Sequence, residues 1–313
     1  MFAAAALLAI FFAPGQSGGT GFAMGSALTQ TLWISNIRGG TQVTRQIAAA
    51  LQALEEQLNT AQDPPAPAIE LMRASDGAFN PYLGALAALW NIDGESPRVP
   101  AREEVAAALQ QKQHDPGAYG KGMACDAALA VLRQNKARAA VINLGGNVLT
   151  YGRKPRLWAG GGKPFIIALR DPKGNANDTL GVFTLEGTNF ISTSGSYEKY
   201  FTRGGVRYHH IFDAATGYPS RRDPGLVSVT VVTRNPEQET AKQSLPAGVL
   251  PAGVAGDALS TACFVLGYAQ SRALLASHGA DALFIYEDGS IKPVGQAKKI
   301  FTLTNSSYHW GLA

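Results

Sequence analysis

Residues 191–220 have the sequence ISTSGSYEKYFTRGGVRYHHIFDAATGYPS. Hydroxyl side chains surround Gly195, and Gly204-Gly205 is a dipeptide of the kind that joins two antiparallel strands. The second strand leads into two histidines, an aspartate and the turn Ala-Thr-Gly-Tyr-Pro. The pattern predicts a hairpin that brings small hydrogen-bonding groups, one candidate base and a rigid turn close together. A solvated hairpin without function also carries polar residues, so this stretch alone leaves that alternative open.

The segment TSGSYEKYF…YHHIFDAATGYP resembles the signature of the FAD:protein FMN transferases, the ApbE family. Other pieces occur in the family's order, and the resemblance covers roughly residues 22–300: AMGS, SDGAFNP, GKGMACD, INLGGNV and DALSTACFVLG. Several ordered motifs are more specific than any single one. The resemblance implies an α+β fold, with mixed β-sheets and packed helices in one interwoven, T-fold-like domain.

The length and charge of the chain limit the number of domains and the kinds of partner. A chain of 313 residues is long enough for one large domain or two small ones. The net charge is +4, and the basic residues are scattered rather than clustered with aromatics, which argues against nucleic acid as a partner. No G-x-G-x-x-G follows a predicted strand, and the glycines at residues 160–162 lack the other residues of a phosphate-binding P-loop.

Cys125 and Cys263 both lie in apolar segments with helical character, and neither has the spacing of a zinc ligand set. We expect both to be small core residues. A disulfide between them is the alternative that the sequence leaves open.

The N-terminus predicts a signal-like apolar segment at residues 1–20, followed by the transferase-like domain at residues 21–313. Residues 3–13 (AAAALLAIFFA) are uninterrupted apolar residues, and no charged side chain occurs before Arg38. The run is shorter than the ~20 residues that span a bilayer but suits the apolar part of a signal peptide. The usual basic start of a signal peptide is missing, which leaves open that the N-terminus is truncated or wrongly assigned. We expect export to the periplasm or the outer face of the inner membrane, with membrane association through the N-terminus as a further option.

The spacing of apolar residues and the positions of glycine and proline predict the helices and strands. Residues 21–37 are expected as one strand, Gly39-Gly40 as a break, and the residues from Val43 to just before Asp63 as an amphipathic helix. Residues 226–233 alternate and predict a strand with one buried face. The remaining expectations are helices at 69–74, 83–90, 101–113 and 123–134, strands at 139–148, 165–170 and 181–185, a loop at 234–255, a helix starting at Asp257 and a terminal hairpin at 281–293.

Two places carry candidate anion- or metal-binding groups. Residues 114–122 form a glycine-rich turn before a helix, where free backbone amides attract anions, although ordinary helix caps look similar. Lys121 adds a positive charge there, and Asp115 lies six residues earlier. Asp257 and Thr261 are four residues apart in a predicted helix, so their oxygens share one face. An aspartate at a helix start is most often a cap.

The resemblance, rather than these patterns, implies individual roles. It implies that His210 is the catalytic base, whereas its neighbour His209 should face the opposite side of the strand. Magnesium would be held by Asp257, Thr261 and the carbonyl of Ala118. FAD would be contacted by Met24, Ala78, Phe79, Asn80, Asp115, Lys121 and Phe212.

The chain departs from the family pattern in four places. It lacks most of a segment near residue 63 and two strands near residue 100, and it has Asn80 and Ser260 where the family often has acids.

The implied reaction is the Mg²⁺-dependent transfer of the FMN part of FAD to a Thr or Ser hydroxyl of an acceptor protein, with release of AMP. Family acceptors include flavin-bearing redox subunits. One alternative is a Mg²⁺-dependent FAD pyrophosphatase that yields FMN and AMP. The other is a non-catalytic FAD-binding protein.

Overall fold

The computed structural model describes residues 15–34, 37–155, 162–175, 177–234 and 250–311. Its centre is a nine-stranded mixed sheet with the order β1-β2-β3-β4-β9-β14-β15-β16-β18, in which only β16 and β18 run parallel. These strands are β1 Gly15–Ala23, β2 Ser26–Ile34, β3 Ala139–Leu144, β4 Asn147–Gly152, β9 Asn189–Gly195, β14 Leu226–Arg234, β15 Asp281–Tyr286, β16 Ser290–Val294 and β18 His309–Trp310.

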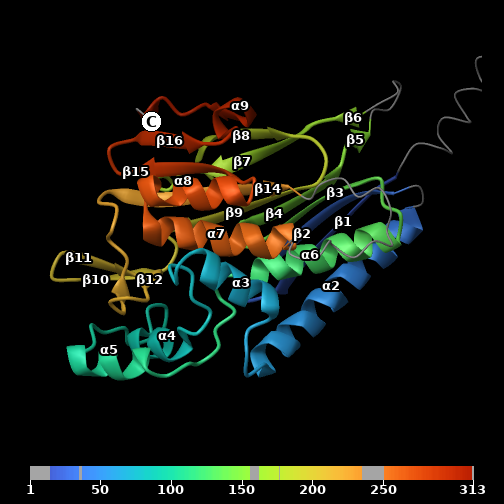
Figure 1. Cartoon of the computed structure of the whole chain (residues 1–313). Helices are drawn as coiled ribbons and strands as arrows, with labels where there is room; N and C mark the ends of the chain where they lie inside the picture. The colour runs from blue at the N-terminus through green and yellow to red at the C-terminus, as the bar shows by residue number, and fades with distance from the viewer. Residues whose placement is uncertain (1–14, 35–36, 156–161, 176, 235–249, 312–313) are drawn as a thin grey trace, which may run out of the picture.

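A smaller sheet covers one face of the central sheet (Figure 1). Its strand order is β17-β8-β7, with β7 at Phe165–Arg170, β8 at Thr179–Leu185 and β17 at Phe301–Leu303. Phe183 of β8 and Phe301 of β17 belong to one buried cluster with Ile191 of β9 and Val232 of β14. Two layers of sheet therefore enclose one of the hydrophobic cores.

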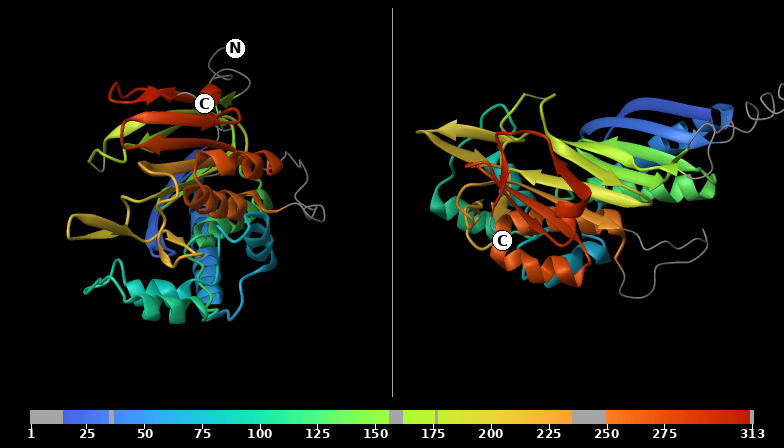
Figure 2. Two further views of the ribbon diagram at one scale, coloured as in Figure 1. Left: turned by 60° about the vertical axis from the view of Figure 1, so that its left-hand side comes forward. Right: turned by 90° about the horizontal axis from the view of Figure 1, so that it is seen from above.

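Helices cover the opposite face of the central sheet, as the two further views in Figure 2 also show. The long helices α2, α6 and α7 lie along the strands, and α4 and α5 lie at one end of the molecule beside the β10–β11 hairpin (Figure 1). Their bounds are α2 Ile37–Thr60, α3 Ala66–Ala74, α4 Gly84–Trp90, α5 Arg102–Leu109, α6 Gly120–Gln134, α7 Ala252–Leu266, α8 Tyr268–Ser277 and α9 Ala297–Ile300. The expected α+β fold, with mixed sheets and packed helices in one interwoven unit, is confirmed.

The hairpin predicted around Gly204-Gly205 is present. It consists of β10 Tyr200–Arg203 and β11 Val206–His209, and it projects from the body between the central sheet and α4 (Figure 1). The residues before it belong to β9, which pairs with β4 and β14 inside the central sheet. Two further pairs are short: β5 Lys154–Pro155 with β6 Gly162–Lys163, and β12 Phe212–Asp213 with β13 Tyr218–Pro219.

The N-terminal elements differ from the prediction. Residues 21–37 are not one strand: β1 and β2 form a hairpin whose turn, Met24-Gly25, has positive φ at both residues. Residues 15–20, which the sequence grouped with the apolar segment, are part of β1, whereas residues 3–13 lie outside the described part of the chain. Gly39-Gly40 does not break the chain, because α2 continues through it. A Cβ on Gly40 would lie 2.5 Å from Ser17, so glycine here lets α2 pack closely on β1.

Other helices and strands also differ from the prediction because of tertiary packing. The strand β14 is buried along both faces instead of one, since α7 covers one side and the smaller sheet the other. Helix α7 begins at Ala252, five residues before the expected start at Asp257, and α6 begins at Gly120. Helix α5 ends at Leu109, earlier than expected. The strand β4, which follows the Gly145-Gly146 turn, was not predicted as a separate element.

Cys125 and Cys263 are both buried and both free, so the core assignment is confirmed and the disulfide alternative is wrong. Among the residues that the structure describes, no helix is both long and apolar enough to cross a membrane.

Candidate functional site

Two glycines bring the start of α6 against α7. A Cβ on Gly122 would lie 2.2 Å from the carbonyl oxygen of Gly253, and a Cβ on Gly253 would lie 2.3 Å from the carbonyl oxygen of Gly122. Only glycine permits this approach on both sides. At this crossing the Gly122 N–H donates to Asp257 Oδ2 at 2.9 Å. The glycine-rich turn and the carboxylate, 135 residues apart in sequence, are therefore in direct contact.

This contact leaves the Ala118 carbonyl free. In a regular α-helix the N–H of residue 122 would donate to the carbonyl of residue 118. Here it donates to Asp257 instead, and the neighbouring N–H groups of Gly120 and Met123 donate to Pro116 and Tyr119. Within the described parts of the chain, no hydrogen bond is made to the Ala118 carbonyl. The sequence-predicted oxygens of Ala118 and Asp257 thus come together at the start of α6.

Asp257 is not a helix cap. It lies in the second turn of α7 and is buried, with 4% of its surface exposed. The α7 N-terminus is instead capped by Asp126 of α6, whose two carboxylate oxygens accept the N–H groups of Gly253 and Val254 at 2.9 and 2.8 Å. Because another residue performs the capping role, the ordinary explanation for an aspartate at this place does not apply to Asp257.

Thr261 lies one turn after Asp257 and contacts the central sheet. The Ser194 hydroxyl of β9 is 3.1 Å from the Thr261 hydroxyl and 2.8 Å from that of Ser260. Ser260 also donates to the Asp257 carbonyl at 2.8 Å. Ser194 therefore holds this turn of α7 against the sheet. The sequence shows Ser194 only as one of the hydroxyl residues around Gly195, because its partners lie 66 and 67 residues away in the chain.

The oxygen set suits a hard cation. A carboxylate, a hydroxyl and a backbone carbonyl are ligands that Mg²⁺ accepts, and Mg²⁺ commonly uses only one or two protein carboxylates beside substrate phosphates. No cluster of three or more His, Cys, Asp or Glu side chains occurs in the part of the chain that the structure describes. Asp257, Thr261 and Ala118 therefore fit a partial coordination shell that a phosphate ligand would have to complete.

Three chain segments converge beside the α6 start. The Met24 N–H of the β1–β2 turn donates to Glu55 Oε2 at 2.9 Å. The Met24 side chain extends to Gly120, where a Cβ would lie 2.8 Å from Met24 Cε. Lys121 extends past the glycine turn after β3, with its Cδ 3.7 Å from where a Cβ of Gly145 would be. Met24 and Lys121 are thus brought together with the INLGGNV turn.

Asp115 shapes the glycine-rich turn. Its Oδ1 accepts the Gly117 N–H at 2.8 Å, and its own N–H donates to the Pro81 carbonyl at 2.9 Å. The second bond joins this turn to the SDGAFNP segment. In that segment Asn80 Oδ1 accepts the Tyr82 N–H at 2.9 Å.

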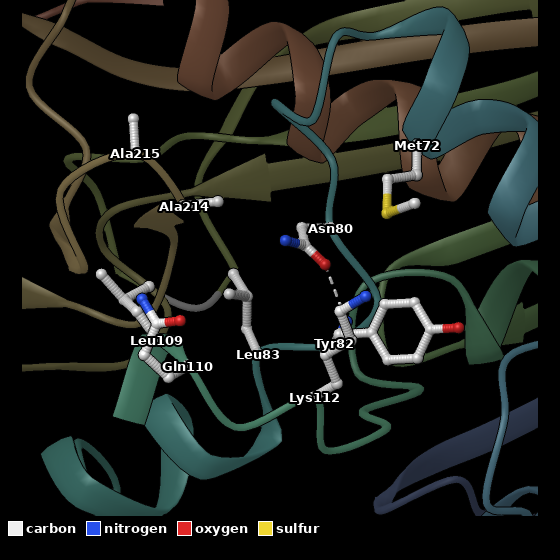
Figure 3. A pocket seen from close by; sticks show the side chains of 9 residues that line it. All are labelled: Met72, Asn80, Tyr82, Leu83, Leu109, Gln110, Lys112, Ala214 and Ala215. Atoms are coloured by element: carbon white, nitrogen blue, oxygen red, sulfur yellow. Dashed lines mark hydrogen bonds between the residues drawn. The ribbon is translucent and has the colours of Figure 1, made fainter. Parts of the chain in front are cut away.

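Asn80 lies at a cavity of about 380 Å³ between the SDGAFNP loop, the end of α5 and the turn after β12 (Figure 3). The residues that line it are Met72, Asn80, Tyr82, Leu83, Leu109, Gln110, Lys112, Ala214 and Ala215. Phe79, in contrast, is completely buried, with its ring edge-on to Tyr119 at 6.2 Å. Ala78 is also buried. The two side chains support this loop from inside.

The two histidines face different surroundings, as alternation along the strand predicts. The His209 ring is buried: its Nδ1 accepts the Ile211 N–H at 3.3 Å and its Nε2 donates to the Ser220 carbonyl at 3.1 Å. His210 is only partly buried, and its Nδ1 lies 3.2 Å from the Lys199 carbonyl. The pKa of His210 is lowered to about 4, mainly by burial and also by the charges of Lys199 and Lys121, against raising effects of the Lys199 carbonyl and Asp93. Lys121, at the α6 start, is therefore close enough to His210 for its charge to affect the His210 pKa.

Phe212 is part of an aromatic cluster around Trp90, and the ring centroids of Phe212 and Trp90 are 5.8 Å apart. The Trp90 Nε1–H donates to the Gly217 carbonyl at 2.9 Å, and Arg222 binds Asp213 through two hydrogen bonds of 2.6 and 2.7 Å. These contacts fix the Ala-Thr-Gly-Tyr-Pro turn. Phe212 is 7% exposed, so its side chain acts mainly in packing. The sequence predicts Trp90 only as the end of a helix, because Gly217 lies 127 residues away in the chain.

Comparison with known proteins gives a consistent result. The model of the ApbE family matches residues 66–284. A protein from Treponema pallidum named FAD:protein FMN transferase is 34% identical over 70% of this chain, and one of the same name from Klebsiella pneumoniae is 31% identical over 74%. The matched parts are 63% and 71% of those relatives' lengths. The crystal structure of the ApbE protein from Thermotoga maritima superposes with a TM-score of 0.73 at 26% identity, covering 91% of this chain and 99% of that one.

Proposed function

Because this chain belongs to the ApbE family, we propose that it is an FAD:protein FMN transferase. In the proposed reaction, the hydroxyl oxygen of a threonine or serine in an acceptor protein attacks the phosphorus on the riboflavin side of FAD. The bond from that phosphorus to the bridging oxygen breaks, and AMP leaves. The acceptor hydroxyl loses its proton, and FMN becomes joined to the acceptor by a phosphoester.

The observation that carries the proposal is the setting of His210. Its Nδ1–H donates to the Lys199 carbonyl, which leaves the Nε2 lone pair available for a proton. Because burial lowers the pKa of His210 to about 4, the ring is neutral at neutral pH. A hydroxyl is a weak nucleophile under these conditions, and a neutral imidazole within hydrogen-bond reach is the usual base for it. We assign proton removal to Nε2.

The α6 start would bind the FAD phosphates. The N–H groups of Gly120, Gly122 and Met123 already have partners, so the row of free amides expected from the sequence is not present at this turn. The attraction for the phosphates would come from the positive end of the α6 dipole and from the full positive charge of Lys121. Asp115 holds the turn in shape through the Gly117 N–H. The cavity beside Asn80 is large enough for part of a nucleotide, and its loop is joined to this turn through Pro81.

Asp257, Thr261 and the Ala118 carbonyl would hold Mg²⁺. When bound, the ion would neutralise negative charge on the phosphates and on departing AMP. The protein's part is to keep these oxygens in place: Gly122 orients the Asp257 carboxylate, and Ser194 orients the Thr261 hydroxyl.

The test is incubation of the purified protein with FAD, Mg²⁺ and a candidate acceptor protein that carries a flavin in its mature form. We expect the acceptor to gain the mass of FMN while AMP appears in equal amount. AMP with free FMN and an unmodified acceptor would instead support the FAD pyrophosphatase, since water and a protein hydroxyl can use the same base. Bound FAD without AMP would leave only the non-catalytic binding protein.

We further propose that the protein is exported, on the basis of the apolar residues 3–13. Fractionation of cells that express the full chain tests this proposal. Recovery of the protein in the cytoplasm alone would contradict it.

A further inference from the structure

A second hollow, of about 430 Å³, lies away from the groups assigned above. It is formed by the end of β7 and the loop after it, the β10–β11 hairpin and the β15–β16 turn. The side chains that matter for its chemistry are Arg170, Lys173, Tyr197, Tyr200, Arg207 and Glu287.

The central sheet separates this hollow from the metal-binding oxygens. Along β9, Ser194 faces α7, where it contacts Thr261. The next residue, Gly195, faces the other side, where a Cβ would lie 2.4 Å from the Tyr197 ring that lines the hollow. A ligand here would therefore lie behind the sheet from Asp257.

The β10–β11 hairpin separates the hollow from the aromatic cluster around Trp90. The stacked pair Phe201 and Tyr208 occupies one face of the hairpin. The ring centroid of Tyr208 lies 5.6 Å from that of Trp90. Tyr200 and Arg207 occupy the opposite face, because residues alternate along each strand, and both line the hollow. His210 directly follows this hairpin.

The hollow is positively charged and partly aromatic. Three cations line it against one carboxylate, that of Glu287. Arg170 is paired with Glu198 at 3.2 Å, and the Lys173 ammonium donates to the Glu287 backbone carbonyl. The pKa of the exposed Asp288 carboxylate is lowered mainly by hydrogen bonds from Ser290, and to a smaller extent by the nearby charge of Lys173.

Lys173 and Arg207 nevertheless form no ion pair with any carboxylate of the described residues. The Arg207 guanidinium lies over the Tyr200 ring, 4.5 Å from its centroid, and Tyr200 is 45% exposed. Stacking on the ring holds the guanidinium in place while leaving its edge N–H groups free for a planar carboxylate. The hollow thus presents Arg207, held by stacking and without an ion pair among the described residues, next to the exposed Lys173 and the exposed ring of Tyr200.

We propose that this hollow docks an acidic segment of the acceptor protein. The proposal rests on the proposed function and adds the chemistry of acceptor recognition. A hydroxyl that reaches His210 must be presented beside the β10–β11 hairpin, and a single hydroxyl contributes little affinity. The remaining affinity must come from the surface around it, where exposed cations both speed association and select acidic partners.

The first experiment measures binding without turnover. A fluorescein-labelled acidic peptide and its counterpart with Asn and Gln in place of Asp and Glu are titrated with protein by anisotropy. We expect the Lys173→Glu/Arg207→Glu variant to bind the acidic peptide at least roughly tenfold more weakly than wild type, about the loss of one charge-assisted contact. The matched control is Arg45→Glu, a charge reversal at an exposed position of α2, which should bind as wild type does.

The second experiment separates this proposal from the proposed function. With an acceptor protein, we expect the double variant to raise KM for the acceptor and to leave the affinity for FAD unchanged. An unchanged KM, equal binding of the acidic and neutral peptides, or a loss of FAD affinity instead would overturn the docking proposal while transfer by wild type stands. Absence of FMN transfer by wild type would overturn the proposed function, whatever the peptide titration shows.

Discussion

His209 and His210 are adjacent in the chain, yet only one of them can serve as a base. Both ring nitrogens of His209 are engaged with backbone groups, one as acceptor and one as donor, and its ring lies edge-on to Phe264. His210 uses only Nδ1 within the described structure. Burial is the first cause that lowers the pKa of each ring to about 4. The difference in role therefore comes from hydrogen bonding rather than from basicity.

For His210→Gln we expect transfer to fall by about 10²–10⁴-fold with FAD binding retained, because the base is lost and the nucleotide contacts stay. In wild type, His210 stays neutral as the pH falls from 7 and becomes protonated only near its pKa of about 4. The rate should therefore drop through about pH 4 and not through 6.5. Steady-state rates with quantified AMP across this range check both points. His309→Gln, at an exposed position, is the control, and a profile that falls near pH 6.5 would contradict the assignment.

For Asp257 we expect two substitutions to separate charge from packing. Asp257→Asn keeps an oxygen that accepts the Gly122 N–H, whereas Asp257→Ala removes it. Both should abolish Mg²⁺-dependent AMP release, but only the alanine variant should also lose stability, by about 1–3 kcal/mol for the unpaired buried N–H. Urea unfolding and AMP assays over a range of Mg²⁺ concentrations measure the two effects. Full Mg²⁺-dependent activity in Asp257→Asn would remove Asp257 from the ligand set.

At the scale of elements, the site depends on how closely α6 and α7 approach each other. Gly122 and Gly253 are packed against each other's backbone, and Asp126 of α6 caps α7. Each helix thus holds the other's proposed site residues in place: Lys121 and the Ala118 carbonyl lie at the start of α6, and Asp257 and Thr261 lie in α7.

We expect Gly122→Ala to force the two helices apart, because the new Cβ would meet a backbone oxygen at 2.2 Å that cannot move alone. Overpacking of this kind costs about 1–3 kcal/mol. It should also weaken the Mg²⁺ dependence, since Asp257 loses its partner. Chemical denaturation and Mg²⁺ titration of activity test this. Gly21→Ala in β1 is the control, because its Cβ would be 3.9 Å from the nearest atom. Equal stability of the two variants would show that the crossing tolerates a side chain.

At the scale of the whole molecule, the sheets and helices hold the two thiols out of contact with solvent. Burial raises the pKa of Cys125 and raises that of Cys263 to about 12, so neither thiol is ionised near neutral pH. We expect the melting temperature to be the same with and without dithiothreitol. A thiol reagent such as Ellman's should react with both cysteines only after unfolding. Rapid reaction of the native protein, or a lower melting temperature under reduction, would contradict this arrangement.

Much of the architecture could be predicted from local pattern. The β10–β11 hairpin follows from Gly204-Gly205, the terminal hairpin from residues 281–293, and the helix after the glycine-rich turn from its apolar spacing. The errors have a common cause. Gly39-Gly40 looked like a break, and residues 226–233 looked like a strand with one buried face, because neither pattern contains the neighbour that packs on it.

The α+β composition, the family motifs and the types of oxygen and nitrogen donors could all be predicted before folding was considered, since these depend on residues close in the chain. Three features of the site became visible only in the folded chain: Asp257 is not a cap, the Ala118 carbonyl has no hydrogen bond among the described residues, and both His209 ring nitrogens bind backbone groups. Each of these depends on a contact between distant segments. Such contacts form only when the core packs, so no local spacing could predict them.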